Sequence, residues 1–140
     1  MASLIYNSFR KKIMDGSIDL DTDTIKVALV TSTYTPNQDV HDFFDDITNE
    51  VTGTGYTAGG TTLTTKTVTQ DNTNDRGVWD ADDANWTVST ITARGAVIYK
   101  STGVSSTSAL IAYIDFSSDK VSDGGTFTIA WSASGILYIA

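Results

Sequence analysis

Two dense runs of β-branched and aromatic residues, at positions 91–100 and 109–116, constrain the fold of this chain more than any other feature. Such residues are enriched in strands, and the Ser/Thr/Gly cluster between the runs is typical of a hairpin turn. Near the middle of both runs, as at residues 96–98, apolar side chains occupy odd and even positions alike. A strand with one buried face would alternate, so we expect paired central strands covered on both faces, by a second sheet or a neighbouring subunit. A helix is the competing interpretation, and Gly95 disfavours it.

The composition favours a single β domain. The chain has 140 residues, no cysteine, one proline and twenty-three threonines. Without cysteine it can form neither a disulfide framework nor a thiolate metal site. A threonine-rich chain of short strands suits a β-sandwich or barrel. We therefore expect one mainly β domain over residues 1–140, with a helix or arm at residues 1–16 and an irregular segment at residues 31–60.

The charge of the chain bears on its partners. Seventeen acidic and nine basic residues give a formal net charge of −8. A surface of this sign repels phosphates, so we expect no nucleic-acid partner. No stretch is apolar for long enough to span a bilayer, and the first residues show no cleavage pattern of an exported protein. We therefore expect neither a membrane partner nor export.

The first residues predict a short amphipathic helix. Ile5, Phe9 and Ile13 recur every four positions, which places them on one helical face. Ser3 is a candidate cap at the start, and Gly16 can take the left-handed position beyond the end. This helix either covers one end of the sheet or docks as an arm on a partner, and in the second case Ile5 and Phe9 would make the contact.

Two acidic stretches raise the question of a calcium site. Asp19, Asp21 and Asp23 resemble the start of an EF-hand loop, but Thr24 and Val30 stand where that loop needs glycine and a bidentate glutamate. We interpret this stretch as a solvated entrance to a strand at residues 25–30.

A second acidic stretch, at residues 71–83, is also dense in carboxylates and amides. It matches no calcium loop and is interpreted first as a turn that hydrogen-bonds its own backbone, with Ca²⁺ binding left open.

The segment at residues 31–60 is the least regular part of the chain. Pro36 interrupts any strand, and one or two helical turns after it would bring Phe43 and Phe44 alongside Ile47. Two interpretations remain open for these three residues. They either anchor a long loop to the core or form a protein-binding surface, since aromatic pairs on loops are common anchors.

The remaining segments predict further strands. We expect strands at residues 61–70 and 86–89, a turn at residues 117–125, and a strand at residues 126–131 whose apolar residues alternate.

The last residues, 136–140, predict a final apolar strand. Such a strand invites aggregation unless it is paired, so we expect it inside the sheet or against another subunit, with Leu137 and Tyr138 as candidate contacts.

No catalytic constellation stands out. The only histidine, His41, has serines and aspartates nearby in sequence but no nucleophile elbow, so a Ser-His-Asp hydrolase is disfavoured. The glycines of residues 53–60 superficially match a dinucleotide fingerprint, but threonines follow where that fingerprint needs a helix. We expect a non-enzymatic protein without a cofactor or a bound metal, whose work is binding.

Four stretches are distinctive in combination. They are DLDTDTIKVALVTSTYTP (residues 19–36), DITNEVTGTGYTAGG (46–60), TVTQDNTNDRG (67–77) and TARGAVIYK (92–100). Together they resemble a family of small structural proteins of tailed bacteriophages, encoded among head genes. The resemblance looks closest to the jelly-roll cement, or decoration, proteins that sit on the outside of capsids.

The resemblance implies a fold and a role. The fold would be a jelly-roll-like antiparallel β-sandwich with a short N-terminal helix. The protein would be made in the host cytoplasm and would then bind the major capsid protein on the exterior of the virion. Its own copies would associate as a homodimer or homotrimer at a symmetry axis. The candidate partner-binding residues are Ile5, Phe9, Phe43, Phe44, Ile47, Leu137 and Tyr138.

Two other binding roles compete with this one. A neck, collar or tail component of the particle would use the same β domain in a ring or a fibre attachment. A carbohydrate-binding module would stack sugars on Trp79, Trp86 or Trp131. The alternation around Trp131 points that ring towards the core, which weakens the carbohydrate interpretation.

Overall fold

The computed structural model describes residues 2–140 and is mainly β, with 45% strand and 10% helix. Two antiparallel sheets and one short helix confirm the predicted fold class, a β-sandwich with an N-terminal helix. The elements are β1 (Leu4–Ile5), α1 (Asn7–Met14), β2 (Ile25–Val30), the 3-10 helix η1 (Phe44–Asp46), β3 (Thr61–Thr62), β4 (Thr67–Asp71), β5 (Arg76–Asp80), β6 (Ala84–Lys100), the 3-10 helix η2 (Ser105–Thr107), β7 (Leu110–Ile129) and β8 (Leu137–Ile139).

The predicted central hairpin is β6 and β7, which pair antiparallel with Val97 opposite Tyr113. They occupy the middle of a five-stranded sheet in the order β1-β7-β6-β2-β3. Residues 96–98 are all buried, as the absence of alternation indicated. The strand predicted at residues 25–30 is β2, which pairs with β6.

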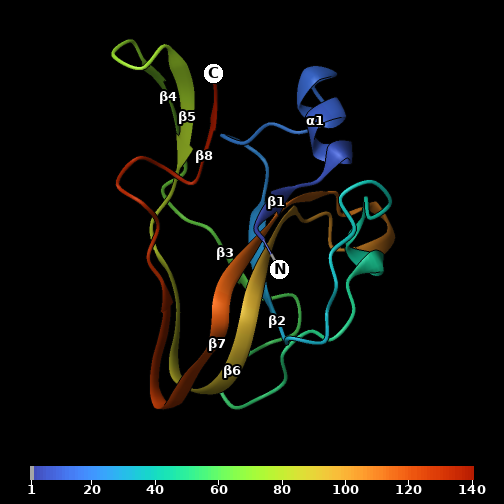
Figure 1. Cartoon of the computed structure of the whole chain (residues 1–140), viewed down its shortest axis with the longest axis vertical. Coiled ribbons are helices and arrows are strands. Elements are labelled where there is room, and N and C mark those ends of the chain that lie inside the picture. Colours follow the sequence, from blue (N-terminus) through green and yellow to red (C-terminus); the bar gives the residue numbers. More distant parts are fainter. Residues whose placement is uncertain (1) are drawn as a thin grey trace.

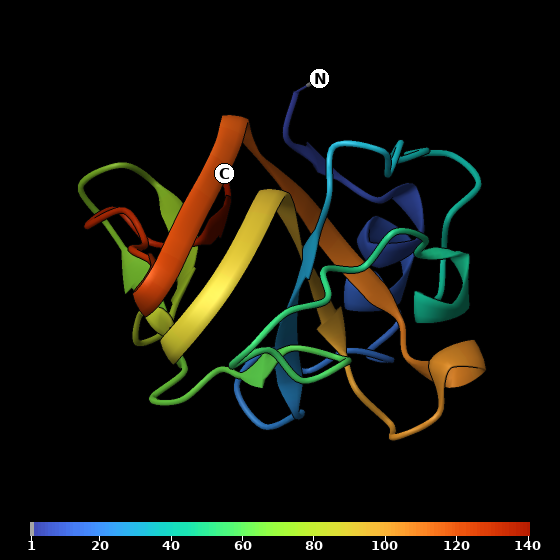
Figure 2. The same ribbon diagram turned by 90° about the horizontal axis from the view of Figure 1, so that it is seen from below.

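Both faces of the hairpin are covered by the chain itself. On one face Val97 and Tyr113 pack with Tyr6 and Tyr34. On the other face the core contains residues from α1, from the segment that follows it and from the second sheet, whose strand order is β4-β5-β8. Figure 2 shows the second sheet on one side of the hairpin and residues 31–47 on the other. The cover is therefore a second sheet on one side and the irregular loop on the other.

The turn predicted at residues 117–125 is wrong, because β7 continues through it. Between the pairs Gly95–Asp115 and Ala93–Lys120, four residues of β7 lie opposite the single residue Arg94. Such bulges interrupt the ladder without ending it, and their serines and glycines resemble a turn in the sequence.

A second irregularity bends the hairpin. Val88 and Gly124 both have positive φ, 47° and 72°, where the register shifts again. Bends of this kind let one pair of strands contribute to both layers of a sandwich. Beyond the bend the two strands lead into β5 and β8, where Trp79 pairs with Leu137 (Figure 1).

The N-terminal helix begins later than predicted. Leu4–Ile5 forms β1, with Leu4 opposite Tyr113, and the helix starts at Asn7. Ser3 caps no helix; its hydroxyl accepts a hydrogen bond from the Asp115 amide at 2.9 Å. Pairing with β7 therefore prevails over helix propensity in the first residues. The predicted end is confirmed, since Gly16 has a φ of 79°.

The strand predicted at residues 61–70 is two short strands in different sheets. β3 pairs with β2, whereas β4 pairs with β5, and Thr65 lies between them with a φ of 54°. The Gly-rich turn before them packs closely on β2. A Cβ on Gly60 would lie 1.8 Å from the Val27 carbonyl oxygen, so this position needs glycine.

Candidate interaction surface

The aromatic pair of the long loop lies against the protein's own core. The Phe44 ring stacks on Tyr99 with ring centroids 4.2 Å apart, and Ile47 packs on the same cluster. Phe43 forms an isolated β-bridge with Ala109 and packs on the other core cluster. All three side chains are half-buried. They anchor the loop to both cores, and whether their exposed parts contact a partner stays a prediction.

The loop containing these residues is also held by polar contacts. The Asp46 carboxylate accepts hydrogen bonds from the backbone amides of Asp42, at 2.9 Å, and Phe43, at 3.4 Å. The Leu110 amide donates to the Asp42 carbonyl at 3.0 Å, which ties the loop to the start of β7. The predicted helical turns are reduced to the single 3-10 turn η1, because these contacts hold the flanking residues extended.

The predicted contacts at the two ends of the chain lie close together. Ile5 and Leu137 line one cavity, and Leu137 and Tyr138 line a second one beside it. Phe9 lies apart from this group, because it is buried in the core. We call the two adjoining cavities the β8 cleft. The larger part has a volume of about 670 Å³ and the smaller part about 380 Å³.

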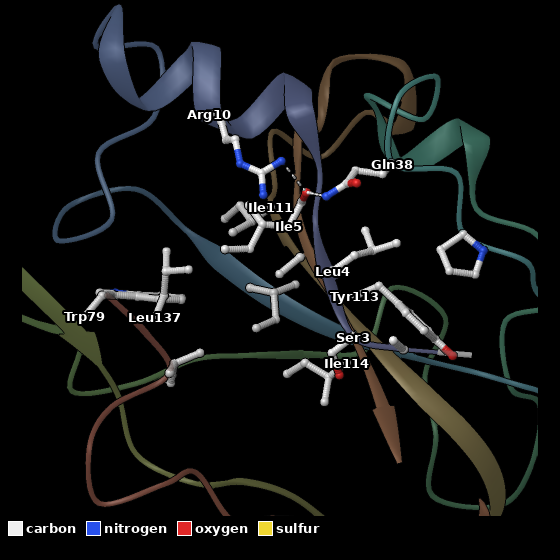
Figure 3. Close-up of a pocket in the computed structure, with 15 residues that line it drawn as sticks. Ser3, Leu4, Ile5, Arg10, Gln38, Trp79, Ile111, Tyr113, Ile114 and Leu137 are labelled. Atoms are coloured by element: carbon white, nitrogen blue, oxygen red, sulfur yellow. Dashed lines mark hydrogen bonds between the residues drawn. The ribbon is translucent and has the colours of Figure 1, made fainter. Parts of the chain in front are cut away.

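The β8 cleft has residues of β1 and α1 on one wall and residues of β8 on the other. In Figure 1 the ribbons of α1 and β8 lie at the same end of the molecule. Its larger part is lined by Leu4 and Ile5 of β1, Ile111 and Ile114 of β7, and Leu137 of β8 (Figure 3).

Its smaller part lies between Ile13 of α1, Ile18, Leu20, and Ile139 of β8. Trp79 lines both parts, and its indole N–H donates to the Leu20 carbonyl at 3.0 Å. The cleft thus has a fixed, mostly apolar lining.

Polar groups gather at one wall of the larger part. The Arg10 guanidinium and the Gln38 amide both donate to the Ile5 carbonyl, at 3.1 and 2.8 Å (Figure 3). Arg10 is exposed, and no carboxylate within residues 2–140 forms an ion pair with it. No acidic side chain is among the described residues that line this part. The larger part is therefore lined by one cationic side chain and, among the described residues, by no acidic one, although the chain as a whole has a formal net charge of −8.

Asp19, the one acidic residue among the described residues at the smaller part, is hydrogen-bonded within its own turn. Asp19 accepts hydrogen bonds from the backbone amides of Asp21 and Thr22, at 3.0 and 3.2 Å. These hydrogen bonds stabilise the carboxylate and lower the pKa of Asp19. The second acidic stretch shows the same arrangement. The Asp71 carboxylate accepts hydrogen bonds from the side chains of Asn74 and Arg76, and these hydrogen bonds lower the pKa of Asp71.

An unpaired strand edge borders the cleft. β8 pairs with β5 on one side, and in the described part of the chain no strand pairs with its other edge. The predicted pairing of the final strand is therefore confirmed on one edge only. Tyr138 and Ile139 are 56% and 59% exposed. An exposed apolar edge offers backbone donors and acceptors to a second strand.

His41 is hydrogen-bonded to a network of buried tyrosines. Its Nδ1 lies 2.9 Å from the Tyr34 hydroxyl, which lies 2.9 Å from the Tyr6 hydroxyl. Burial raises the pKa of Tyr34 to about 12 and raises that of Tyr6 as well. Both tyrosines therefore stay neutral and serve as hydrogen-bonding members of the core.

Two of the three tryptophans offer little surface for stacking. Trp79 and Trp86 are 2% and 5% exposed, so neither presents a face to a sugar. Trp131 is half-buried, and its indole N–H donates to the Asp82 carbonyl at 3.0 Å. Within residues 2–140 no three His, Cys, Asp or Glu side chains come together as they would around a metal ion.

No protein family, curated protein or solved structure matches the chain. Among residues 2–140, no helix has the length and apolar character needed to cross a membrane. The candidate site is therefore defined by its geometry, which is an apolar cleft with a cationic wall beside an unpaired strand edge.

Sequence patterns identified part of this site and missed the rest. Ile5, Leu137 and Tyr138 carried a signal because they are apolar and lie in amphipathic or edge elements. Arg10 and Gln38 carried none, since a single polar residue in a helix or loop is ordinarily solvated.

Proposed function

We propose that the protein is a non-enzymatic structural protein of a phage virion, a cement protein that binds the outside of the major capsid shell and stabilises it. The observation that carries this proposal is the β8 cleft, where a mostly apolar lining and an unpaired strand edge are both open to a partner. The resemblance of residues 19–36, 46–60, 67–77 and 92–100 to small head proteins supports the same role.

The mechanism is thermodynamic linkage. A protein that binds the assembled shell better than the free shell subunits shifts the equilibrium towards the assembled state. Each contact can be weak, because many copies act on one particle. Apolar groups at the centre of an interface supply most of the binding free energy. The net charge of −8 keeps the free protein from adsorbing to nucleic acid during assembly.

In this role the protein is made in the host cytoplasm and ends on the exterior of the capsid, without a cofactor. A homodimer or homotrimer at a symmetry axis would match the symmetry of the shell. The exposed parts of Phe43, Phe44 and Ile47 would supply a contact separate from the β8 cleft.

The test is a particle that lacks the protein. We expect depleted particles to assemble, because the shell subunits define the lattice, and to lose DNA at a lower temperature than complete particles. Adding the purified protein back should restore the difference. Depleted particles as robust as complete ones would contradict the proposal, and copies found only at the neck would favour a neck, collar or tail component.

A further inference from the structure

We propose that the β8 cleft binds an extended segment of a partner protein, which adds to β8 as the next strand of the second sheet. The segment has apolar side chains at alternate positions and a carboxylate that reaches Arg10. The source of this segment is the shell protein, and in this respect the inference rests on the proposed function. The site and the chemistry of its occupant follow from the cleft alone.

The open edge of β8 determines the conformation of the occupant. β8 has three residues, and the sheet order β4-β5-β8 leaves one of its edges without a partner among the described strands. A strand that pairs with such an edge lies about 4.8 Å away and satisfies its backbone groups. The edge of β1 is less available, because the Ile5 carbonyl already accepts from Arg10 and Gln38.

The walls of the cleft determine which positions of the occupant are apolar. Leu137 and Ile139 point to the same face of β8, since side chains alternate along a strand, and both line the cleft, as does Tyr138 between them. An added strand would continue this alternation. Its inward side chains would fill the space between these residues and Ile5 and Ile13 on the opposite wall.

Arg10 determines which charge the occupant of the β8 cleft carries. Its guanidinium has a carbonyl and the Asn7 amide oxygen as acceptors but no carboxylate within residues 2–140. A carboxylate at this wall would gain a charge-assisted hydrogen bond, whereas a cation would meet a like charge. Among the described residues, no acidic side chain lines the larger part, and the Asp39 carboxylate joins this network through the Asn7 amide, at 2.7 Å, rather than through the guanidinium.

A second copy of the chain fits this wall less well. Residues 130–140, which contain β8, have no acidic side chain, so the β8 strand of another copy brings no carboxylate side chain to Arg10. The occupant is therefore assigned to a different protein.

The first test uses two peptides and the purified protein. One acetylated, amidated peptide alternates valine and glutamate, and the other alternates valine and lysine. In a titration followed by amide NMR shifts, we expect the glutamate peptide to bind about tenfold or more tightly than the lysine peptide. Its shifts should centre on residues 137–139, whose amides should exchange more slowly. Equal binding of both peptides, or shifts centred elsewhere, would overturn the inference.

Matched variants locate the contact. Ile139→Lys places a charge on the β8 edge, and Val104→Lys makes the same change at a residue of similar exposure, 55% against 59%, outside the cleft. Arg10→Glu reverses the charge at the wall, and Lys11→Glu does so at the next, also exposed, residue. We expect the first member of each pair to lose about tenfold or more in affinity for the glutamate peptide and the second to keep it. Equal melting temperatures within each pair would show that folding is intact.

The same variants on depleted particles separate the two proposals. If wild-type protein binds the peptide but not the particles, the proposed function fails and the cleft assignment stands. If Ile139→Lys occupies the particles as fully as Val104→Lys, the cleft assignment is overturned while the proposed function stands. Sedimentation decides the remaining alternative, because a dimer that becomes a monomer only in Ile139→Lys would assign the cleft to a second copy.

Discussion

The two ends of the central hairpin bury apolar surface in different ways. At the five-stranded sheet, the loop of residues 31–47 closes over β6 and β7, and Tyr6, Tyr34 and Tyr113 are at most 1% exposed. At the second sheet, Tyr138 and Ile139 remain more than half exposed beside the β8 cleft. Both ends are rich in apolar residues, but at the second sheet the chain leaves the outer strand β8 uncovered on one edge. The uncovered end is therefore the place to look for a partner.

The first prediction tests the energetic side of this comparison. Leu110→Ala removes a fully buried side chain of β7 from the closed end and should lower the free energy of unfolding by about 4 kcal/mol. Ile139→Ala, the control in β8, should change it by no more than about 0.5 kcal/mol. Urea unfolding of both variants measures the difference. Similar losses in the two variants would show that the β8 end is as closed as the other end.

The second prediction concerns the loop of residues 31–47, which covers the hairpin at the closed end. Phe44→Ala removes a half-buried ring that stacks on Tyr99 and should cost about 2 kcal/mol of folding stability. Val40→Ala changes a residue of the same loop that is 68% exposed and should be nearly neutral. Unfolding measurements test the anchoring role.

Occupancy on depleted particles tests the other role of Phe44. If Phe44 only anchors the loop to the core, Phe44→Ala should occupy the particles as fully as the wild-type protein at temperatures where the variant is folded. A loss of occupancy without a loss of stability would instead make Phe44 an interface residue, and the closed end would then bind a partner too.

The third prediction uses the tyrosines buried at the closed end. Burial raises the pKa of Tyr34 and Tyr99 to about 12, from an ordinary value of 10.0. A tyrosine whose pKa is higher in the folded state contributes stability that is complete below the unfolded pKa and is lost as pH rises through the folded pKa. The free energy of unfolding should therefore fall between about pH 10 and pH 12, by up to about 1.4 kcal/mol per pH unit for each such group.

Tyr34→Phe provides the comparison for this pH dependence. The variant loses the hydroxyl that contacts Tyr6 and His41, so it should be less stable at neutral pH. Its stability should also fall less steeply above about pH 10, because one titrating group is gone. Urea unfolding at several pH values measures both slopes. If the free energy of unfolding of Tyr34→Phe fell with pH as steeply as that of the wild-type protein, Tyr34 would not contribute to the loss of stability at alkaline pH.

The sequence predicted the closed end better than the open one. Residues 96–98 are apolar without alternation, and this pattern directly reports burial on both faces. The start of α1 was misplaced because β1 is specified by its pairing with β7, which local sequence does not encode.

The β8 cleft was recognisable only in pieces. Its apolar residues at the two ends of the chain were identified separately, but their adjacency depends on the bend of the hairpin at Val88 and Gly124. That bend resembles a turn in the sequence, because bulges and turns use the same residue types. Arg10 lines the cleft only because the two ends of the chain meet there, so the sequence alone could not assign it to this site.

The last prediction concerns the acidic turn of the second sheet. Removing divalent cations with a chelator should leave the melting temperature unchanged within about 1 °C, because the carboxylates there already have partners. Asp71 accepts hydrogen bonds from Asn74 and Arg76, and Asp82 accepts one from the Thr65 hydroxyl. An ion that binds the folded state alone stabilises it by an amount that rises with the ratio of its free concentration to its Kd, so a bound ion would be visible as a fall in melting temperature on chelation. A fall in melting temperature that Ca²⁺ reverses and sodium chloride does not would assign residues 71–83 to a cation, and the second sheet would then hold two binding sites instead of one.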